Sequence, residues 1–140
     1  MSVDALVAEA RAQLALDTKE GRKAAYAKLM DAFACFAQPG LVAEGAPLFT
    51  LLGDVYWQAG EVRTALRAWT DAVSCPKALG TAELHLRLGK ARFELKELDR
   101  AADELARAFM GGGRELLERE DPRYFDFLKT RLSPPAGERW

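Results

Sequence analysis

The feature that most constrains this chain is an internal repeat with a period of 36 residues. The segment FTLLGDVYWQAGEVRTALRAWTDA aligns with HLRLGKARFELKELDRAADELARA, so that Gly53 falls on Gly89 and Trp69 falls on Leu105. Repeats of this length usually consist of one supersecondary unit that buries its apolar face against its neighbours. The chain is therefore expected to fold as a short array of similar units.

Apolar residues recur at the spacing of one helical face along most of the chain, and no stretch alternates β-branched and polar residues as a strand would. The apolar stripes run over 3–14, 26–36, 48–59, 62–73, 84–95 and 98–109. The second stripe consists of Tyr26, Leu29, Phe33 and Phe36. A last helix is predicted to begin at Asp121-Pro122, because aspartate caps helices well and proline suits the first turn. An all-α fold of seven or eight helices is expected.

The first of the two aligned segments resembles the tetratricopeptide repeat. That pattern has Leu-Gly and Tyr on one helix, a turn, and two small alanines flanking a large apolar residue on the next helix. The matching residues are Leu52, Gly53, Tyr56, Gly60, Ala65, Trp69 and Ala72. The period exceeds the family's roughly 34 residues by two loop residues around 78–80. The second segment departs at Arg92, where the family has Tyr, and at Lys96, where it has Gly.

The resemblance implies an all-α, right-handed helical-repeat stack with a C-terminal capping helix. A single domain over 1–140 is expected. Its parts are a degenerate first helix pair over 3–38, repeat units over 46–75 and 82–109, a cap over 112–132 and a frayed tail over 133–140. In the degenerate pair, Ala25, Leu29 and Ala32 have the spacing of a second repeat helix.

In such arrays the first helices of successive units line a concave groove that holds a protein or peptide partner. Carried over by position, the partner-binding candidates are Thr50, Asp54, Trp57, Gln58, Glu83, Arg87, Lys90, Phe93 and Glu94. Each unit contributes one aromatic residue flanked by charges, which is a plausible recognition surface. The alternative interpretation makes Trp57 and Phe93 partly buried packing residues. The family's carboxylate clamp is excluded because it depends on asparagine, which this chain lacks.

The glycine triplet in FMGGGRELLER has two interpretations. Glycines followed by a basic residue can cradle an anion, but a phosphate-binding loop needs a preceding strand and a Gly-Lys-Ser/Thr close, which are missing here. The favoured interpretation is a break after Phe109 that lets the chain turn into the cap. Tyr124, Phe125 and Phe127 are then expected to cover the end of the core.

Composition and charge exclude several functional classes. The chain has 140 residues, 49% of them hydrophobic, and a net charge of −1. A nucleic-acid interface would normally show a basic face, and no apolar run is long enough to span a bilayer. The N-terminus has no signal-peptide pattern, so a cytoplasmic protein is expected. The abundance of Ala, Leu and Arg without Ile or Asn favours a bacterial, GC-rich origin.

Candidate chemical groups are few. His85 falls at a helix-packing position, where a structural role is favoured over catalysis. Cys35 and Cys75 lie among apolar residues and are expected to be reduced and buried. The His and Cys clustering that a metal site requires is missing from the sequence. No catalytic residue, metal or cofactor is expected, and the chain is interpreted as a protein other than an enzyme.

The leading functional hypothesis is a non-catalytic protein–protein interaction module of the bacterial cytoplasm. The block AFMGGGRELLEREDPRYFDFLKTRL also resembles the end of small, stand-alone bacterial tetratricopeptide proteins, some of them encoded near toxins. This second resemblance implies a toxin-neutralising, immunity-like form of binding. The alternative hypothesis is a self-associating structural subunit that forms homo-oligomers.

Overall fold

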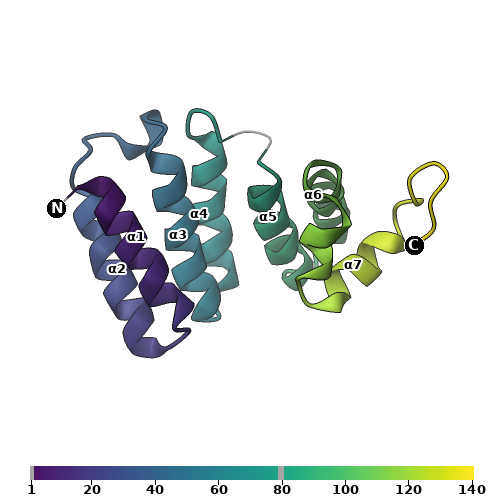
Figure 1. Cartoon of the computed structure of the whole chain (residues 1–140), viewed down its shortest axis with the longest axis horizontal. Helices are drawn as coiled ribbons and strands as arrows, with labels where there is room; N and C mark the ends of the chain where they lie inside the picture. Colours follow the sequence, from purple (N-terminus) through teal and green to yellow (C-terminus); the bar gives the residue numbers. More distant parts are fainter. Residues whose placement is uncertain (1, 79–80) are drawn as a thin grey trace. The chain divides into compact units, whose positions relative to one another are not determined.

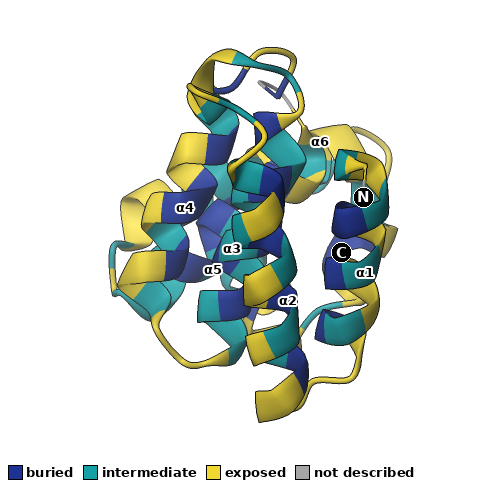
Figure 2. Cartoon of the chain, turned by 90° about the vertical axis from the view of Figure 1, so that its left-hand side faces the viewer, coloured by how far each residue is buried: buried dark blue, intermediate teal, exposed yellow. Residues whose placement is uncertain are grey.

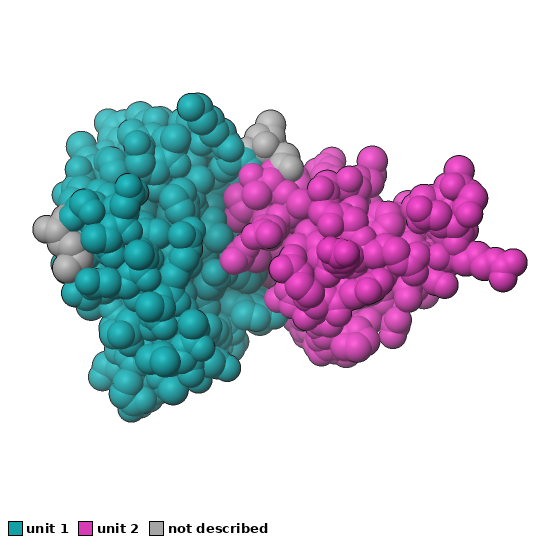
Figure 3. Space-filling view, in the orientation of Figure 1, with its two compact units in different colours: residues 1–79 teal, residues 80–140 magenta. Residues whose placement is uncertain are grey.

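The computed structural model describes residues 2–78 and 81–140. Within these ranges the chain forms seven α-helices, one short 3-10 helix and no strand, which confirms the prediction of an all-α fold (Figure 1). Two compact units are present, Met1–Leu79 and Gly80–Trp140 (Figure 3). Of the extra loop residues predicted around 78–80, Leu79 and Gly80 lie outside the described residues.

The helices of the two units are, in chain order, α1 (Val3–Ala15), α2 (Lys19–Phe33), η1 (Pro39–Leu41), α3 (Gly45–Gln58) and α4 (Val62–Ser74), then α5 (Ala82–Glu94), α6 (Leu98–Glu118) and α7 (Pro122–Lys129). The closest packing is between α1 and α2, α3 and α4, and α5 and α6, which lie side by side. None of the described helices combines the length and the apolar character needed to cross a membrane.

Each of these three helix pairs is joined by a turn of three residues. The middle residue of each turn has a positive φ, which is 49° at Asp17, 82° at Gly60 and 64° at Lys96. A left-handed residue directly after a helix reverses the chain and brings N–H groups back to the last helical carbonyls. The same backbone device therefore ends α1, α3 and α5, although the residue type differs.

The last two of these turns share their hydrogen bonds as well. Glu61 N–H donates to the carbonyl of Tyr56 at 2.9 Å. Glu97 N–H donates to the carbonyl of Arg92 at 2.9 Å, which is the same bond 36 residues later. The Arg92 side chain stays partly exposed and pairs with Glu97, with Nη1 and Oε2 2.6 Å apart. The turn thus keeps its geometry where the sequence departs from the Tyr and Gly of the first copy.

Replacing Lys96 with glycine is expected to raise the free energy of unfolding of the second unit by about 1 kcal/mol, because a left-handed conformation penalises any side chain. Gly60→Ala is the matched change in the other direction and should lower the stability of the first unit by a similar amount. Urea denaturation followed by far-UV circular dichroism measures both. No gain in stability for Lys96→Gly would contradict the assigned turn conformation.

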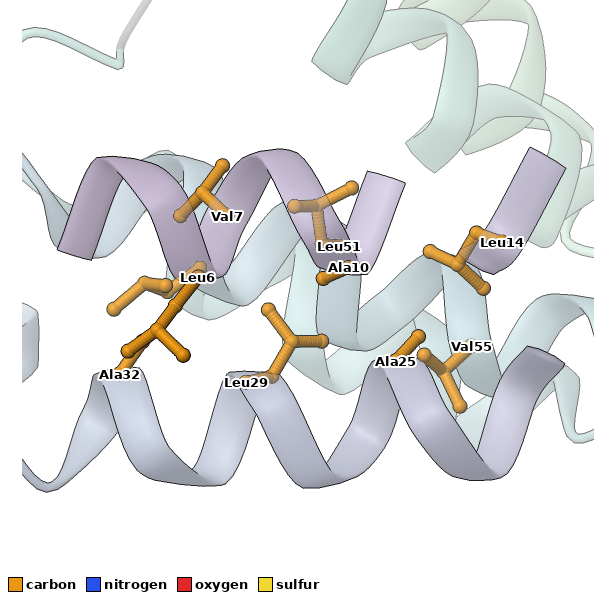
Figure 4. Close-up of a cluster of buried hydrophobic side chains, with 10 residues drawn as sticks. Leu6, Val7, Ala10, Leu14, Ala25, Leu29, Ala32, Leu51 and Val55 are labelled. Carbon is orange, nitrogen blue, oxygen red and sulfur yellow. The ribbon is translucent and has the colours of Figure 1, made fainter. Parts of the chain in front are cut away.

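One buried cluster of the first unit lies between α1, α2 and α3, as Figure 4 shows. Its buried residues are Leu6, Val7, Ala10, Leu14, Ala25, Leu29, Ala32, Leu48, Leu51 and Val55. Each of the three helices contributes one apolar face, and buried and exposed positions recur along each helix accordingly (Figure 2).

The buried face of α2 corrects the stripe predicted for 26–36 at Tyr26, whereas Phe33 and Phe36 are partly buried and pack against the core cluster. The structure buries Ala25, Leu29 and Ala32, whereas Tyr26 is 41% exposed. Alanines allow the backbones of two packed helices to approach closely, and a tyrosine ring in the same place would keep them apart. The small-residue spacing of the tetratricopeptide pattern was therefore the better guide to this helix.

Glycines on α3 and α5 mark the closest approaches within two of the helix pairs. A Cβ atom added to Gly53 would overlap the indole ring of Trp69 on α4. A Cβ atom added to Gly89 would lie 2.7 Å from the Leu105 side chain on α6, closer than such atoms pack. Each glycine therefore makes room for one large residue on the partner helix, and both residues are fully buried.

The core of the second unit is completed by α7. Tyr124, Phe125 and Leu128 are buried together with Leu105 and Leu117 of α6. Phe127 is partly buried and packs at the edge of the same cluster. The expectation that these aromatic residues of the last helix cover the core is confirmed within this unit.

The glycine triplet breaks the helix later than predicted. The helix was expected to end after Phe109, but α6 continues through Gly111 and Gly112. Only Gly113 leaves helical geometry, with φ 75° and ψ −172°, and the backbone resumes a helix after it. A positive φ is the conformation that glycine adopts without steric cost, so a single residue is sufficient to redirect the chain.

The segment 133–140 was predicted to be frayed, but contacts of its last residue hold it against the second unit. The Trp140 ring lies 5.6 Å from Phe109 and 5.6 Å from Phe125, and its Nε1 donates to the Leu132 carbonyl at 3.1 Å. A large aromatic side chain that also finds a hydrogen-bond partner can hold an otherwise irregular segment on the surface.

Candidate functional site

The candidate residues Thr50 and Asp54 on α3 hold a buried indole. The Nε1 atom of Trp69 donates to the Thr50 carbonyl at 3.0 Å and to Asp54 Oδ1 at 3.2 Å. The Thr50 hydroxyl donates to the carbonyl of Ala46 at 2.7 Å. Both candidates therefore contribute first to the α3–α4 packing, and Trp69 is fixed in position as a result.

The neighbouring candidates on α3, Trp57 and Gln58, are partly buried. The ring of Trp57 lies 5.6 Å from that of Trp69 at an interplanar angle of 40°. The amide Nε2 of Gln58 donates to the Leu14 carbonyl at 3.0 Å and links α3 to the end of α1, while its Oε1 is buried without a hydrogen-bond partner among the described atoms. For Trp57, partial burial against another ring agrees with the packing interpretation, and the residue stays partly exposed.

On α5 the candidates separate into two groups. Glu83 is exposed, and its backbone carbonyl accepts from Arg87 Nη1 at 3.4 Å. Lys90, Phe93 and Glu94 lie further along the helix and contact α7 or the turn before it. The structure thus brings Lys90, Phe93 and Glu94 into contact with other elements of their own unit.

The contacts of the second group are specific. Lys90 Nζ lies 3.2 Å from Glu120 Oε2. Glu94 Oε1 accepts from Arg123 Nη2 and from the Tyr124 hydroxyl, both at 2.8 Å.

The ring of Phe93 lies 5.3 Å from that of Tyr124 and 5.2 Å from that of Phe127. The guanidinium of Arg123 lies 5.7 Å from the Phe93 ring. The chain's own last helix therefore occupies the part of α5 that the sequence assigned to a partner. The aromatic and basic residues of 123–127 were the sequence signal for this contact, but from the sequence we predict only that the aromatic residues among them cover the core.

This cluster perturbs the pKa of Tyr124 and of Asp121. Burial, followed by the hydrogen bond to Glu94, raises the pKa of Tyr124 well above its ordinary value. The backbone and side-chain hydrogen bonds from Arg123 lower the pKa of Asp121, which also caps the N-terminus of α7. Both shifts favour the protonation states found near neutral pH, in which α7 is docked.

The Tyr124→Phe variant is expected to lose stability less steeply than the wild type as pH rises above about 10. The folded protein holds the phenolic proton more tightly than the unfolded chain. That contribution is fully present below the unfolded pKa and is lost as pH rises towards the raised folded pKa. Urea midpoints measured across the alkaline range for both proteins test this, and parallel curves would contradict it.

His85 is buried between α5 and α6. Its Nδ1 lies 2.6 Å from Glu104 Oε2, so the buried ring has a polar partner. Buried polar groups normally require such a partner, and this one links the two helices of the pair. The position agrees with the predicted packing role.

The two cysteines differ in exposure. Cys75 is buried as predicted, and burial, followed by the nearby charge of Asp71, raises the pKa of its thiol. Cys35 is exposed, which corrects the expectation that both are buried. It lies beyond the end of α2, and its neighbour Phe36 is the residue that packs against the core there. Both thiols are free.

The surroundings of the glycine triplet disfavour an anion site. A cavity of about 600 Å³ is lined by Phe109, Gly112, Gly113, Arg114, Glu115, Glu118, Pro135 and Glu138. The one basic side chain, Arg114, already bonds Glu118 at 3.4 Å and the Arg139 carbonyl at 2.8 Å. Three glutamates against one engaged arginine give the cavity a negative balance, which repels a phosphate.

Over the described residues, no group of three or more His, Cys, Asp or Glu is arranged to hold a metal ion.

No family model matches the chain, and no curated protein matches it. The resemblance to tetratricopeptide repeats therefore rests on the residues of this chain alone.

Proposed function

We propose that the chain is a non-catalytic protein-binding module that recognises a protein or peptide partner through the face of α3 that carries Trp57. The observation that supports this is the pre-organisation of that ring. Trp57 packs on the fully buried Trp69, which Thr50 and Asp54 hold by two hydrogen bonds. A rigid, partly exposed aromatic side chain loses little conformational freedom on binding, and such residues often dominate interface energies.

The proposal assigns different roles to the two groups of candidates on α5. Lys90, Phe93 and Glu94 serve mainly to dock α7, whereas Glu83 and Arg87 would contact a partner from the surface of the second unit itself. The proposal includes the right-handed, tetratricopeptide-like stacking that the resemblance implies. It is supported by the equal turns and the equal glycine contacts 36 residues apart. Toxin neutralisation is one form that this binding would take.

The proposal is tested by partner capture with single substitutions. Tagged wild-type protein is incubated with bacterial extract, and the retained proteins are compared with those held by Trp57→Ala, Arg87→Glu and the control Arg67→Glu. Trp57→Ala is expected to weaken capture of a retained partner at least about ten-fold, as loss of a central aromatic residue does. Arg67 is exposed on α4, outside the proposed surface, so Arg67→Glu should retain the partner.

Two further measurements make the result decisive. Circular dichroism melts show whether Trp57→Ala remains folded, and Trp57→Phe, which keeps a ring, should retain part of the capture. Light scattering across protein concentrations tests the alternative of self-association. If the wild type forms an oligomer and Trp57→Ala dissociates it, the partner bound by this face is a second copy of the chain. Equal capture by Trp57→Ala and Arg67→Glu would overturn the assigned surface.

A further inference from the structure

The segment that follows α7 is anchored by one aromatic side chain. The ring of Trp140 meets Phe109 at an interplanar angle of 75° and Phe125 at 82°, with both centroid distances 5.6 Å. These edge-to-face arrangements are the favoured geometry for aromatic pairs. The indole Nε1 donates to the carbonyl of Leu132 at 3.1 Å, so the polar atom of the ring is satisfied as well. The site therefore offers an indole both aromatic contacts and a hydrogen-bond acceptor, and Trp140 is partly buried in it.

Arg114 holds the same segment in a second way. Its guanidinium lies 5.8 Å from the Trp140 ring and 5.9 Å from the Phe125 ring. Its Nη1 donates to the Arg139 carbonyl at 2.8 Å. One side chain thus contacts both the indole and the backbone before it, which is how a site reads a short extended peptide.

Between its two ends the segment spans the cavity rather than filling it. Pro135 and Glu138 form one wall of the cavity of about 600 Å³, and residues of α6 form the other. Residues 136–139 are exposed. Leu117 and Leu128 are fully buried within the core beneath. Release of the segment would therefore open the site and leave the core of the unit in place.

We propose that Phe109, Arg114 and Phe125 form a docking site for a tryptophan-bearing peptide of a partner protein, and that segment 133–140 occupies this site until the peptide displaces it. The chain's own Trp140 shows which side chain the site accepts. The charges of the cavity indicate which residue of the partner peptide should lie before its tryptophan. Glu115 and Glu118 remain in the cavity after Glu138 has left with the segment. A basic residue near the tryptophan complements them. This site lies outside the α3 face and does not depend on the function proposed for it.

The first experiment uses a labelled, C-terminally amidated peptide SPPAGERW and fluorescence anisotropy. The full-length Trp140→Ala variant, whose site is vacated, is expected to bind the peptide at least about ten-fold more tightly than the wild type. The reason is that a tethered segment competes at an effective concentration of about millimolar. A peptide with Glu→Lys at the position of Glu138 should bind more tightly still, and one with Trp→Ala at the position of Trp140 should not bind. Adding Arg114→Ala to the protein should abolish binding.

A second experiment covers the case in which Trp140→Ala does not fold. Wild-type protein labelled with 5-fluorotryptophan gives separate ¹⁹F signals for Trp57, Trp69 and Trp140. Excess Glu→Lys peptide is expected to shift the Trp140 signal to that of an exposed indole and to leave the other two unchanged. An unchanged Trp140 signal would overturn the proposal. Equal peptide binding by wild type and a folded Trp140→Ala variant would do so too. If the wild type is a dimer and Trp140→Ala abolishes the dimer, the proposal of a foreign partner is overturned, and the site binds a second copy of the chain.

Discussion

Replacing Trp69 with alanine is expected to lower the free energy of unfolding of the first unit by about 3–5 kcal/mol. The side chain is 1% exposed and is the largest among those that are fully buried. Its removal leaves a cavity beside Gly53 and takes the donor away from the Thr50 carbonyl and Asp54 Oδ1. Urea denaturation followed by far-UV circular dichroism measures the loss.

Thr70→Ala is a suitable control for Trp69→Ala because Thr70 is the next residue on α4 and is exposed. Its effect should stay within about 0.5 kcal/mol. Trp69→Phe keeps a ring but loses the N–H donor, so its stability should fall between those of Trp69→Ala and the wild type. A loss no larger than that of Thr70→Ala would contradict the packing described for α3 and α4. Since Trp57 rests on Trp69, the alanine variant should also weaken partner capture under the proposed function.

Gly53→Leu is expected to destabilise the first unit by about 1–3 kcal/mol through overpacking. Even the first atom of the new side chain would overlap the indole of Trp69, so α3 and α4 must move apart. Thermal denaturation of the variant measures the effect.

Gly40→Ala provides the matched control for Gly53→Leu, because a Cβ atom at Gly40 would meet nothing within 4 Å. That variant should melt close to the wild type. Equal melting temperatures for the two glycine variants would show that the close approach at Gly53 does not limit stability.

Much of the local structure could be predicted because its signals are local. The helix that begins at Pro122 with Asp121 as its cap was identified from two adjacent residues. Gly60 comes directly after the apolar stripe predicted over 48–59, and in the structure it adopts a left-handed conformation at the end of α3. Lys96 was read as a departure from the pattern, yet it adopts the same conformation. The packing of α5 against α6 imposes the left-handed conformation on Lys96, although a lysine disfavours it.

The candidate site was predicted less well, because a position on a helix face does not reveal what covers it. Lys90 and Glu94 have the spacing and the charge expected of a binding surface. Their partners, Glu120 and Tyr124, lie 30 residues further along the chain. The sequence pattern contained both sets of residues but carried no signal that joined them.

The amino-acid sequence by itself determined that the chain is all-α, where most helices begin and end, and which small residues allow helix pairs to approach. These properties follow from periodicity, caps and turn residues, which act over one or two helical turns. Only the tertiary structure decided that α7 covers part of α5 and that Trp140 is docked between Phe109 and Phe125. Such contacts depend on how whole helices pack. An aromatic residue fills whichever cavity the packed helices leave within its reach, and that cavity exists only once the unit has folded.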